Sequence, residues 1–334
     1  MPGLALNCWK SGAPQGRGTV LRALWGCLTA ALVCACASGA EEPGAWGADH
    51  VDKPLPVLVE GGECLFCHRN SIGARWEANA HQTTVRFFDP GAAEVQVLKA
   101  QGVEAAILNE ITMVLGRDRA QRFLKPNGKY GQAAILNTKW TRTGVERAAD
   151  AAWDDARFAE RCAGCHMSGV DRASGAYSAA GIECYTCHGD VPLEHTEQHE
   201  LAIFSPKRND TPELVTAICA QCHVRNGTSK ATGRPYATHF VPGDNLFMDF
   251  MADLGPETIA AMNTGDQHVL ANVRAVIHGE DKSLTCMSCH TIHKDTSTKH
   301  KKLATTAYCF ICHEGSDMKS GIRPAEVHSP VCEY

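Results

Sequence analysis

The hydrophobic pattern of this 334-residue chain begins with one continuous apolar run near the amino terminus, over 23–37. Lys10, Arg17 and Arg22 precede the run, and three small residues follow it at 38–40. A basic flank, an apolar centre and small residues after it are typical of a secretory signal, and the run is too short to favour a permanent membrane span. We therefore expect a signal peptide over 1–40 and a mature protein outside the cytoplasm.

A second interpretation of the same run stays open. The segment 33–36, Val-Cys-Ala-Cys, resembles a lipoprotein box, which would leave Cys36 lipidated and the protein anchored to a membrane. The residues that follow include Pro43, Pro54 and Pro56, so 41–60 is predicted to be an extended linker.

The pattern changes from helical to β-prone in the middle of the chain. Apolar residues recur at helical spacing over 95–108, whereas 111–115 is rich in β-branched residues and is followed by Gly116. Residues 122–124 and 130–136 flank a Pro-Asn-Gly turn, which predicts a β-hairpin. We expect a small hairpin or sheet insertion around 111–140 in a mostly α-helical protein with much irregular structure.

Helical patterns return further along the chain. Residues 256–261 begin with proline and are expected to start a helix that continues towards Asn263, and 269–277 is also helical in pattern. No segment of the mature chain is long enough and apolar enough to span a membrane.

One motif dominates the chemistry of the sequence: Cys-x-x-Cys followed at once by His. It occurs six times, at Cys64, Cys67 and His68; Cys162, Cys165 and His166; Cys184, Cys187 and His188; Cys219, Cys222 and His223; Cys286, Cys289 and His290; and Cys309, Cys312 and His313. This is the attachment signature of c-type haem, in which two thiols add to the porphyrin vinyl groups and the adjacent imidazole becomes the proximal iron ligand. The chain is therefore predicted to hold six covalent haem c groups.

Other uses of Cys-x-x-Cys fit the sequence less well. A zinc site or a redox dithiol has no need of a His directly after the second Cys. Of the 17 Cys, twelve belong to the motifs, four (Cys8, Cys27, Cys34, Cys36) lie in the leader, and Cys332 is left over. A disulfide framework is thus excluded as the organising principle. Cys332 is expected to be a surface thiol or a link to another chain.

The amino-acid composition bears on the function of the chain only when the predicted haems are counted with it. The charged, aromatic and hydrophobic fractions are those of a soluble globular protein. About fifty mature residues per haem are too few for a separate apolar core around each, so the porphyrins are expected to form the core. The formal charge of −5 becomes more negative with two propionates per haem, which favours basic redox partners over nucleic acid.

The spacing of the motifs organises the mature chain. We expect one haem-packed domain over 61–334, with haem 1 and the β insertion in 61–160, haems 2–4 in 161–250 and haems 5–6 in 251–334. Haems 2 and 3, and haems 5 and 6, follow each other closely in sequence, which predicts stacked pairs. The insertion is expected to shield haem faces, with partner docking or a substrate channel as the alternative.

Ten of the 16 His lie outside the motifs, enough for six distal ligands. His293 follows the proximal His290 by three residues, so it cannot reach the opposite face of its own haem and is expected to bind a neighbouring one. The same argument makes His195, preferred over His199, a ligand to a different haem. The predicted distal ligands are His81, His195, His239, His278, His293 and His328.

Several segments resemble the cytochrome c-554-type multihaem family, whose relatives include the haem cores of hydroxylamine oxidoreductase and octahaem tetrathionate reductase. The similar segments are 64–81 with its Trp76, 116–124 with Trp140, 162–166, 181–195 and 240–246. The resemblance implies extracytoplasmic electron transfer through stacked bis-His haems and supports His81 and His195 as axial ligands. The chain has no Cys-x-x-Cys-Lys motif, so a lysine-ligated catalytic haem is not supported.

Three functions remain open from the sequence. The first is a periplasmic or extracellular electron relay in a respiratory chain, with a quinol-oxidising membrane complex or other cytochromes as partners and no catalytic residue. The second is an oxidoreductase that acts on a small nitrogen or sulfur compound at one five-coordinate haem. The third is a subunit of a cytochrome filament, a homo-oligomer or a larger membrane redox complex. Acidic pairs such as Asp154/Asp155 are interpreted as solvated faces.

Overall fold

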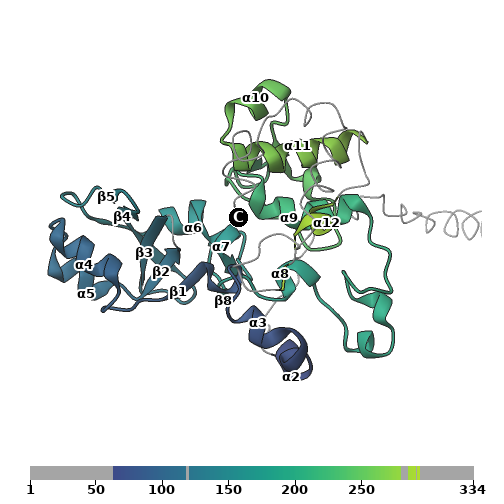
Figure 1. The fold of residues 1–334 in the computed structure, drawn as a ribbon, viewed down its shortest axis with the longest axis horizontal. Helices are drawn as coiled ribbons and strands as arrows, with labels where there is room; N and C mark the ends of the chain where they lie inside the picture. The colour runs from purple at the N-terminus through teal and green to yellow at the C-terminus, as the bar shows by residue number, and fades with distance from the viewer. Residues whose placement is uncertain (1–62, 118–119, 280–284, 291, 294–334) are drawn as a thin grey trace, which may run out of the picture. The chain divides into compact units, whose positions relative to one another are not determined.

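The described part of the chain combines one six-stranded antiparallel sheet with many short helices, most of which lie away from the sheet (Figure 1). The computed structural model describes residues 63–117, 120–279, 285–290 and 292–293, which all lie in one unit of the chain, 44–334.

Several predictions fall on residues outside the described ranges. The predicted signal peptide and the linker are among them. The sixth attachment motif, with Cys309, Cys312 and His313, also lies outside the described residues, as does the predicted distal ligand His328. The attachment of a haem at Cys309 and Cys312, with His313 as its proximal ligand, therefore stays a prediction from the sequence.

Most of the described helices are short. The α-helices are α2 (Cys64–His68), α3 (Ala74–Trp76), α4 (Ala93–Ala100), α5 (Ala105–Glu110), α6 (Arg157–Arg161), α7 (Ala163–His166), α8 (Tyr185–His188), α9 (Pro212–His223), α10 (Pro256–Ala261), α11 (Thr264–His278) and α12 (Cys286–Cys289). A π-helical turn, η3 (Arg69–Gly73), and the 3-10 turns η4 (Gln82–Thr84), η5 (Leu193–Thr196), η6 (His199–Leu201) and η7 (Leu246–Met248) complete the helical elements of the described ranges.

The predicted hairpin is confirmed as the centre of a larger sheet. The strands are β1 (Val85–Phe87), β2 (Met113–Gly116), β3 (Ala120–Pro126), β4 (Ala133–Thr141), β5 (Gly144–Glu146) and β6 (Trp153–Asp154), in the order β1-β2-β3-β4-β5 with β6 also paired to β4. The sheet thus runs beyond the predicted limits of 111–140 at both ends. Two small ribbons, β7 (Met167–Ser168) with β8 (Ala179–Ala180) and β9 (Gly227–Ser229) with β10 (Phe250–Ala252), lie outside it.

The two faces of the large sheet pack against different parts of the chain. On one face, Val85, Leu115 and Leu124 share a buried cluster with Ala163, which lies within the second attachment motif, and Met167, which follows it. The opposite face packs against α4 and α5, in a second cluster that contains Leu98, Leu108, Val114, Phe123 and Leu136. The alternation of side chains along each strand separates the two clusters.

The helix predicted over 95–108 is divided into two helices, α4 and α5. Gly102 lies between them with φ +86°, a left-handed conformation that ends α4. The helix predicted from 256 is confirmed as α10, but it ends at Ala261, and Asn263 instead caps α11 by accepting a hydrogen bond from the Asp266 amide at 3.1 Å.

The longest described helices, α9 and α11, pack against each other. Ala217 and Ala220 of α9 share a buried cluster with Leu270 and Val273 of α11. Pro212 begins α9, and the Thr211 hydroxyl caps it by accepting from the Leu214 amide at 3.2 Å. Among the described residues, no helix is both long and apolar enough to cross a bilayer.

Candidate haem-attachment sites

Five of the six attachment motifs lie in the described residues, and each takes up about one helical turn. Residues three and four apart lie on the same side of a helix, so in the first, third and fourth motifs, which are helical throughout, this turn presents two thiols and an imidazole to one side. The first motif is α2, the second and third begin at the amino ends of α7 and α8, the fourth is the last turn of α9, and the fifth is α12 with the following His290.

Thiols from different motifs lie side by side. Cys64 forms a hydrogen bond with Cys184, which lowers the pKa of Cys64 to about 7 and raises that of Cys184. The first motif is therefore adjacent to the third. A second thiol–thiol hydrogen bond joins Cys165 to Cys222 and lowers the pKa of Cys165. The second motif is therefore adjacent to the fourth.

A third thiol pair extends this array. Cys219 of the fourth motif forms a hydrogen bond with Cys286 of the fifth, which raises the pKa of Cys219 and lowers that of Cys286. The neighbouring motifs are thus 1 with 3, 2 with 4, and 4 with 5, and two of these three pairs are not consecutive along the chain.

The imidazoles of the motifs face imidazoles from elsewhere in the sequence. The ring centres of His68 and His195 are 6.2 Å apart with an interplanar angle of 26°. Those of His188 and His293 are 6.0 Å apart at 14°. His223 faces His81 at 6.2 Å, with the rings inclined by 74°. Three of the predicted distal ligands therefore each lie opposite the proximal His of a different motif.

The separation of these rings fits one metal ion between each pair. Two imidazoles that bind a metal from opposite sides, each with a metal–nitrogen bond of about 2.0 Å, place their ring centres about 6 Å apart. The three observed distances, 6.0 to 6.2 Å, match this value. The residues present therefore fit the two axial positions of haem iron.

Hydrogen bonds hold several of these rings through Nδ1. The Nδ1–H of His188 donates to the Ile203 carbonyl at 2.8 Å, and that of His195 donates to the Pro192 carbonyl at 2.8 Å. His166 pairs through Nδ1 with the Thr84 hydroxyl at 2.6 Å. A ring held in this way presents Nε2 to a metal, and its partner fixes the tautomer and orientation of the ligand.

Burial keeps five of the candidate ligand rings, those of His81, His166, His188, His223 and His293, uncharged. It lowers the pKa of His166 and of His223 to about 4, with a further lowering by Arg225. Burial is also the main cause of the lowered pKa values of His81, His188 and His293. A neutral imidazole is the form that binds a metal, so no proton has to be displaced from these rings near neutral pH.

The other predicted distal ligands have different positions. His239 is nearly buried, forms a hydrogen bond through Nδ1 with the Thr238 hydroxyl at 3.0 Å and lies 3.7 Å from Asp249. His278 is exposed at the carboxyl end of α11, and His328 lies outside the described residues. Their assignment as ligands stays a prediction.

The surroundings of the first motif are the most open of those described. Within it, Phe66 is 92% exposed and Cys67 is also exposed. Leu193, two residues before His195, is 80% exposed. The segment 189–201 that carries His195 contains four acidic residues and no Lys or Arg. We call the exposed residues of 63–68 and 189–201 the acidic edge.

Asn79 connects two of the candidate ligands, although the sequence analysis did not single it out. Its Oδ1 accepts hydrogen bonds from the His81 amide at 2.9 Å and from the His81 ring at 3.2 Å, and its Nδ2 donates to the Ile292 carbonyl at 2.5 Å. The ring of Trp76 lies 6.2 Å from His81 and 6.0 Å from His293. The Asn-x-His spacing, typical of a side chain that bonds the backbone two residues on, is the signal that could have found it.

A zinc array would require several Cys and His side chains around one ion. Over the residues that the structure describes, no three side chains of Cys, His, Asp or Glu converge in this way.

Comparisons with known proteins give a local family match and a distant structural one. No significant match was found among curated proteins. A solved undecaheme cytochrome from the S-layer of Carboxydothermus ferrireducens aligns with 83% of this chain and 44% of its own, at 15% identity and a TM-score of 0.40. The chain thus spans less than half the length of that protein.

The family match covers the second and third attachment motifs. Residues 128–189 match the model of the family described as cytochrome c554 and c-prime. This segment contains β4, the second strand of the predicted hairpin, and the helices α7 and α8 of the two motifs. Through this segment the chain is similar to the family described as cytochrome c554 and c-prime, which supports its interpretation as a multihaem c-type cytochrome.

Proposed function

We propose that this protein is an extracytoplasmic hexahaem cytochrome that relays electrons one at a time between redox partners. The observation that carries the proposal is the set of three imidazole pairs at 6.0 to 6.2 Å, each of which joins a motif to a distant part of the chain. The six motifs supply the count of haems, with the sixth haem assigned to Cys309, Cys312 and His313 on the sequence alone.

The chain uses these pairs to tie its motifs together. His68 of the first motif pairs with His195, which follows the third motif. His188 of the third motif pairs with His293, which follows the fifth motif. His223 of the fourth motif pairs with His81, which follows the first motif. Together with the adjacent thiols, these links make the described motifs one connected array. Such an array supports transfer from haem to haem, because it fixes the relative positions of the groups that exchange electrons.

When bound, the haems supply the redox chemistry, and the residues tune it. Burial of the imidazoles and the hydrogen bonds at Nδ1 are the means by which a protein sets the potential of a haem. Carbonyl acceptors, as at His188 and His195, make the ring more basic and favour the ferric state. No general acid or base is needed for this role.

The acidic edge is the proposed surface at which a partner protein docks and exchanges electrons with this one. Exposed apolar side chains at Phe66 and Leu193 lie on segments that carry the facing rings of His68 and His195. Four acidic residues in 189–201 favour a partner with a basic face around its own redox group. The first haem is therefore the proposed port of the relay.

Intact mass and spin state of the purified, exported protein test the proposal. We expect a mass increase that corresponds to six haems and a loss of 1–40, or an added lipid at Cys36. We also expect a spectrum without a high-spin component in either redox state. Bare thiols would contradict the haem count. A high-spin iron that binds cyanide, with turnover of a nitrogen or sulfur substrate, would favour the enzyme instead. Assembly into filaments would favour the structural role.

A further inference from the structure

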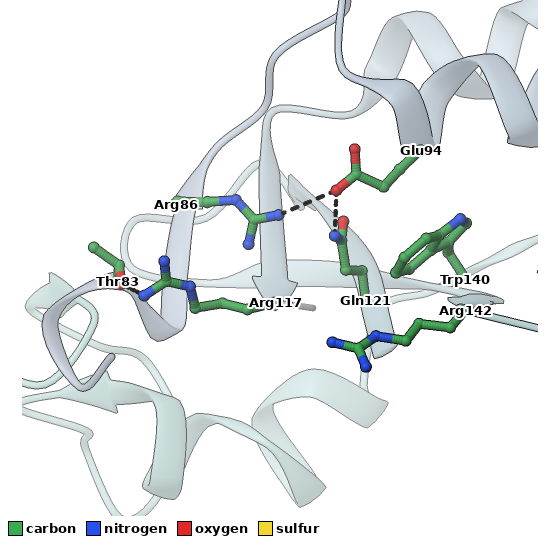
Figure 2. Close-up of a pocket in the computed structure, with 7 residues that line it drawn as sticks. All are labelled: Thr83, Arg86, Glu94, Arg117, Gln121, Trp140 and Arg142. Carbon is green, nitrogen blue, oxygen red and sulfur yellow. Dashed lines mark hydrogen bonds and ion pairs between the residues drawn. The ribbon is translucent and has the colours of Figure 1, made fainter. Parts of the chain in front are cut away.

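A pocket of about 470 Å³ lies beside the large sheet (Figure 2). Two guanidinium groups in its wall have partners within the chain, marked by dashed lines in Figure 2: Arg86 lies 3.8 Å from Glu94, and Arg117 donates to the Thr83 hydroxyl at 3.0 Å. These contacts join β1 to α4, and η4 to the residue after β2. The polar groups of the pocket thus serve the packing of the sheet, and we assign no ligand to it.

The loop over 203–210, by contrast, contacts a candidate ligand through one peptide group, which joins Ile203 to Phe204. On one side of this group, the Ile203 carbonyl accepts a hydrogen bond from the Nδ1–H of His188 at 2.8 Å. On the other side, the Phe204 amide donates to Oδ2 of Asp210 at 2.7 Å. The imidazole, the peptide group and the carboxylate therefore form one continuous chain of hydrogen bonds.

Asp210 is held firmly in this position. Its Oδ1 accepts from Nε of Arg208 at 2.6 Å, and its side chain is only 7% exposed. Asp210 directly precedes Thr211, the residue that caps α9. Hydrogen bonds to an ionised acceptor are stronger than those between neutral groups, and burial reduces their screening by water. The carboxylate is therefore fixed in relation to the helix that ends with the fourth motif.

Phe204 has a backbone conformation that requires such a contact. Its φ is +66°, in the left-handed region that a residue with a Cβ rarely adopts. A conformation of this kind costs free energy and persists where the surrounding structure fixes it. Asp210 fixes the Phe204 amide, and the buried Ile203 packs against α9. The loop thus retains strain in the conformation that turns the Ile203 carbonyl toward His188.

The surroundings of His188 orient its ring and act on its charge. The Phe204 ring meets it edge-on, with ring centres 5.7 Å apart and an interplanar angle of 88°. Burial lowers the pKa of His188, whereas the Ile203 carbonyl and the Asp210 carboxylate act in the opposite direction. Groups that favour positive charge on a ligand ring also favour the ferric state of an iron bound to that ring.

We propose that Asp210 is a positioning residue for the third motif, which acts on His188 through the Ile203–Phe204 peptide group and keeps the potential of that haem low. A carboxylate bonded directly to a metal-bound histidine fixes the ring and makes it more basic. Here one peptide group lies between the two, and hydrogen bonds in a chain strengthen one another. This inference rests on the proposed function, because it requires a haem at the third motif with His188 as its ligand.

A redox titration of the holoprotein, followed by electron paramagnetic resonance, tests the proposal. In Asp210→Ala we expect the potential of one haem to rise, so that its ferrous-to-ferric ratio at a fixed applied potential increases about tenfold, which corresponds to about 59 mV. Asp210→Asn loses the charge but retains an oxygen that accepts from the Phe204 amide. It should shift the same potential less than half as far.

The matched control is Asp253→Ala. Asp253 also accepts from a backbone amide, that of Gly255 at 2.8 Å, but it lies in a loop without a candidate ligand. Its replacement removes the same charge and should change each ferrous-to-ferric ratio less than twofold. Equal shifts in Asp210→Ala and Asp210→Asn would overturn the proposal, because only the charge would then matter. Unchanged potentials in Asp210→Ala would also overturn it.

Exchange of the His188 Nδ1 proton with solvent, followed by NMR of the reduced protein, gives a second measurement. The exchange should be slow in the unmodified protein and in Asp210→Asn, and faster in Asp210→Ala. Rapid exchange in the unmodified protein would overturn the proposal even if Asp210→Ala did not fold. Intact mass separates this inference from the relay itself: bare thiols at the third motif would contradict both, whereas six haems with unchanged potentials would contradict the role of Asp210 alone.

Discussion

At the scale of single residues, His195 and His199 offer a direct test of ligand choice. The two residues lie four positions apart, but the structure places the ring of His195 opposite His68, while His199 is exposed on η6. We predict that His195→Ala produces one high-spin haem in the electron paramagnetic resonance spectrum, because one axial imidazole is lost. The matched variant His199→Ala should leave all spin states unchanged. High-spin iron in His199→Ala alone would reverse the assignment.

The sequence identified the proximal ligand residues, but it did not show which distal ring faces which of them. The fixed spacing of Cys-x-x-Cys-His identifies the proximal residues, because the attachment chemistry is local. Which distal ring faces which motif depends on long-range packing, and the pair of His81 with His223 has no local signal. The same is true of Thr84 and Ile203, which hold rings 82 and 15 residues away.

At the scale of elements, the cap of α9 supports the fourth motif. The Thr211 hydroxyl accepts from the Leu214 amide at the start of the helix that ends with Cys219, Cys222 and His223. We predict that Thr211→Ala lowers the free energy of unfolding by about 1 kcal/mol, because an amide at the helix end loses its acceptor. Denaturant titration followed by circular dichroism measures the change. Thr211→Ser retains the hydroxyl, so its free energy of unfolding should stay close to that of the unmodified protein. An equal loss of stability in both variants would argue against the cap.

The packing of α7 predicts a larger effect at Gly164. An added Cβ there would overlap the ring of Tyr236, whose hydroxyl donates to the Ala159 carbonyl at 2.5 Å. Since this hydrogen bond holds the ring in place, we predict that Gly164→Ala costs about 1–3 kcal/mol of stability through overpacking. The control is Gly265→Ala in the first turn of α11, where the nearest atom is the Asn263 side chain at 3.3 Å. A thermal unfolding midpoint that falls equally in both variants would refute this prediction.

The elements also show where the sequence pattern was informative. The hairpin and α10 were predicted because their turn residues and the initial Pro256 act locally. Strands β1, β5 and β6 have two or three residues each, too few for a periodic signal, and they form because neighbouring strands offer unpaired backbone groups.

At the scale of the whole molecule, we expect surface charge to influence where electrons enter or leave. The acidic edge combines four acidic residues in 189–201 with exposed Phe66 and Leu193 beside the facing rings of the first motif. Opposite charges accelerate encounter, and salt screens the effect over about 10 Å at 0.1 M ionic strength. A cationic oxidant should therefore react with the reduced protein faster than an anionic one of equal driving force, and its rate should fall with salt.

The double variant Glu194→Gln/Glu197→Gln tests this port by stopped-flow oxidation with a ruthenium ammine cation. We predict a rate several-fold lower at low ionic strength and a weaker salt dependence, because two charges near the port are lost. Glu104→Gln/Glu257→Gln removes the same charge from exposed residues on other elements, so it controls for net charge. If both double variants reduced the rate equally, only the total charge of the protein would matter. The slower rate in the first alone, with haem content unchanged, would locate electron exchange at the first motif.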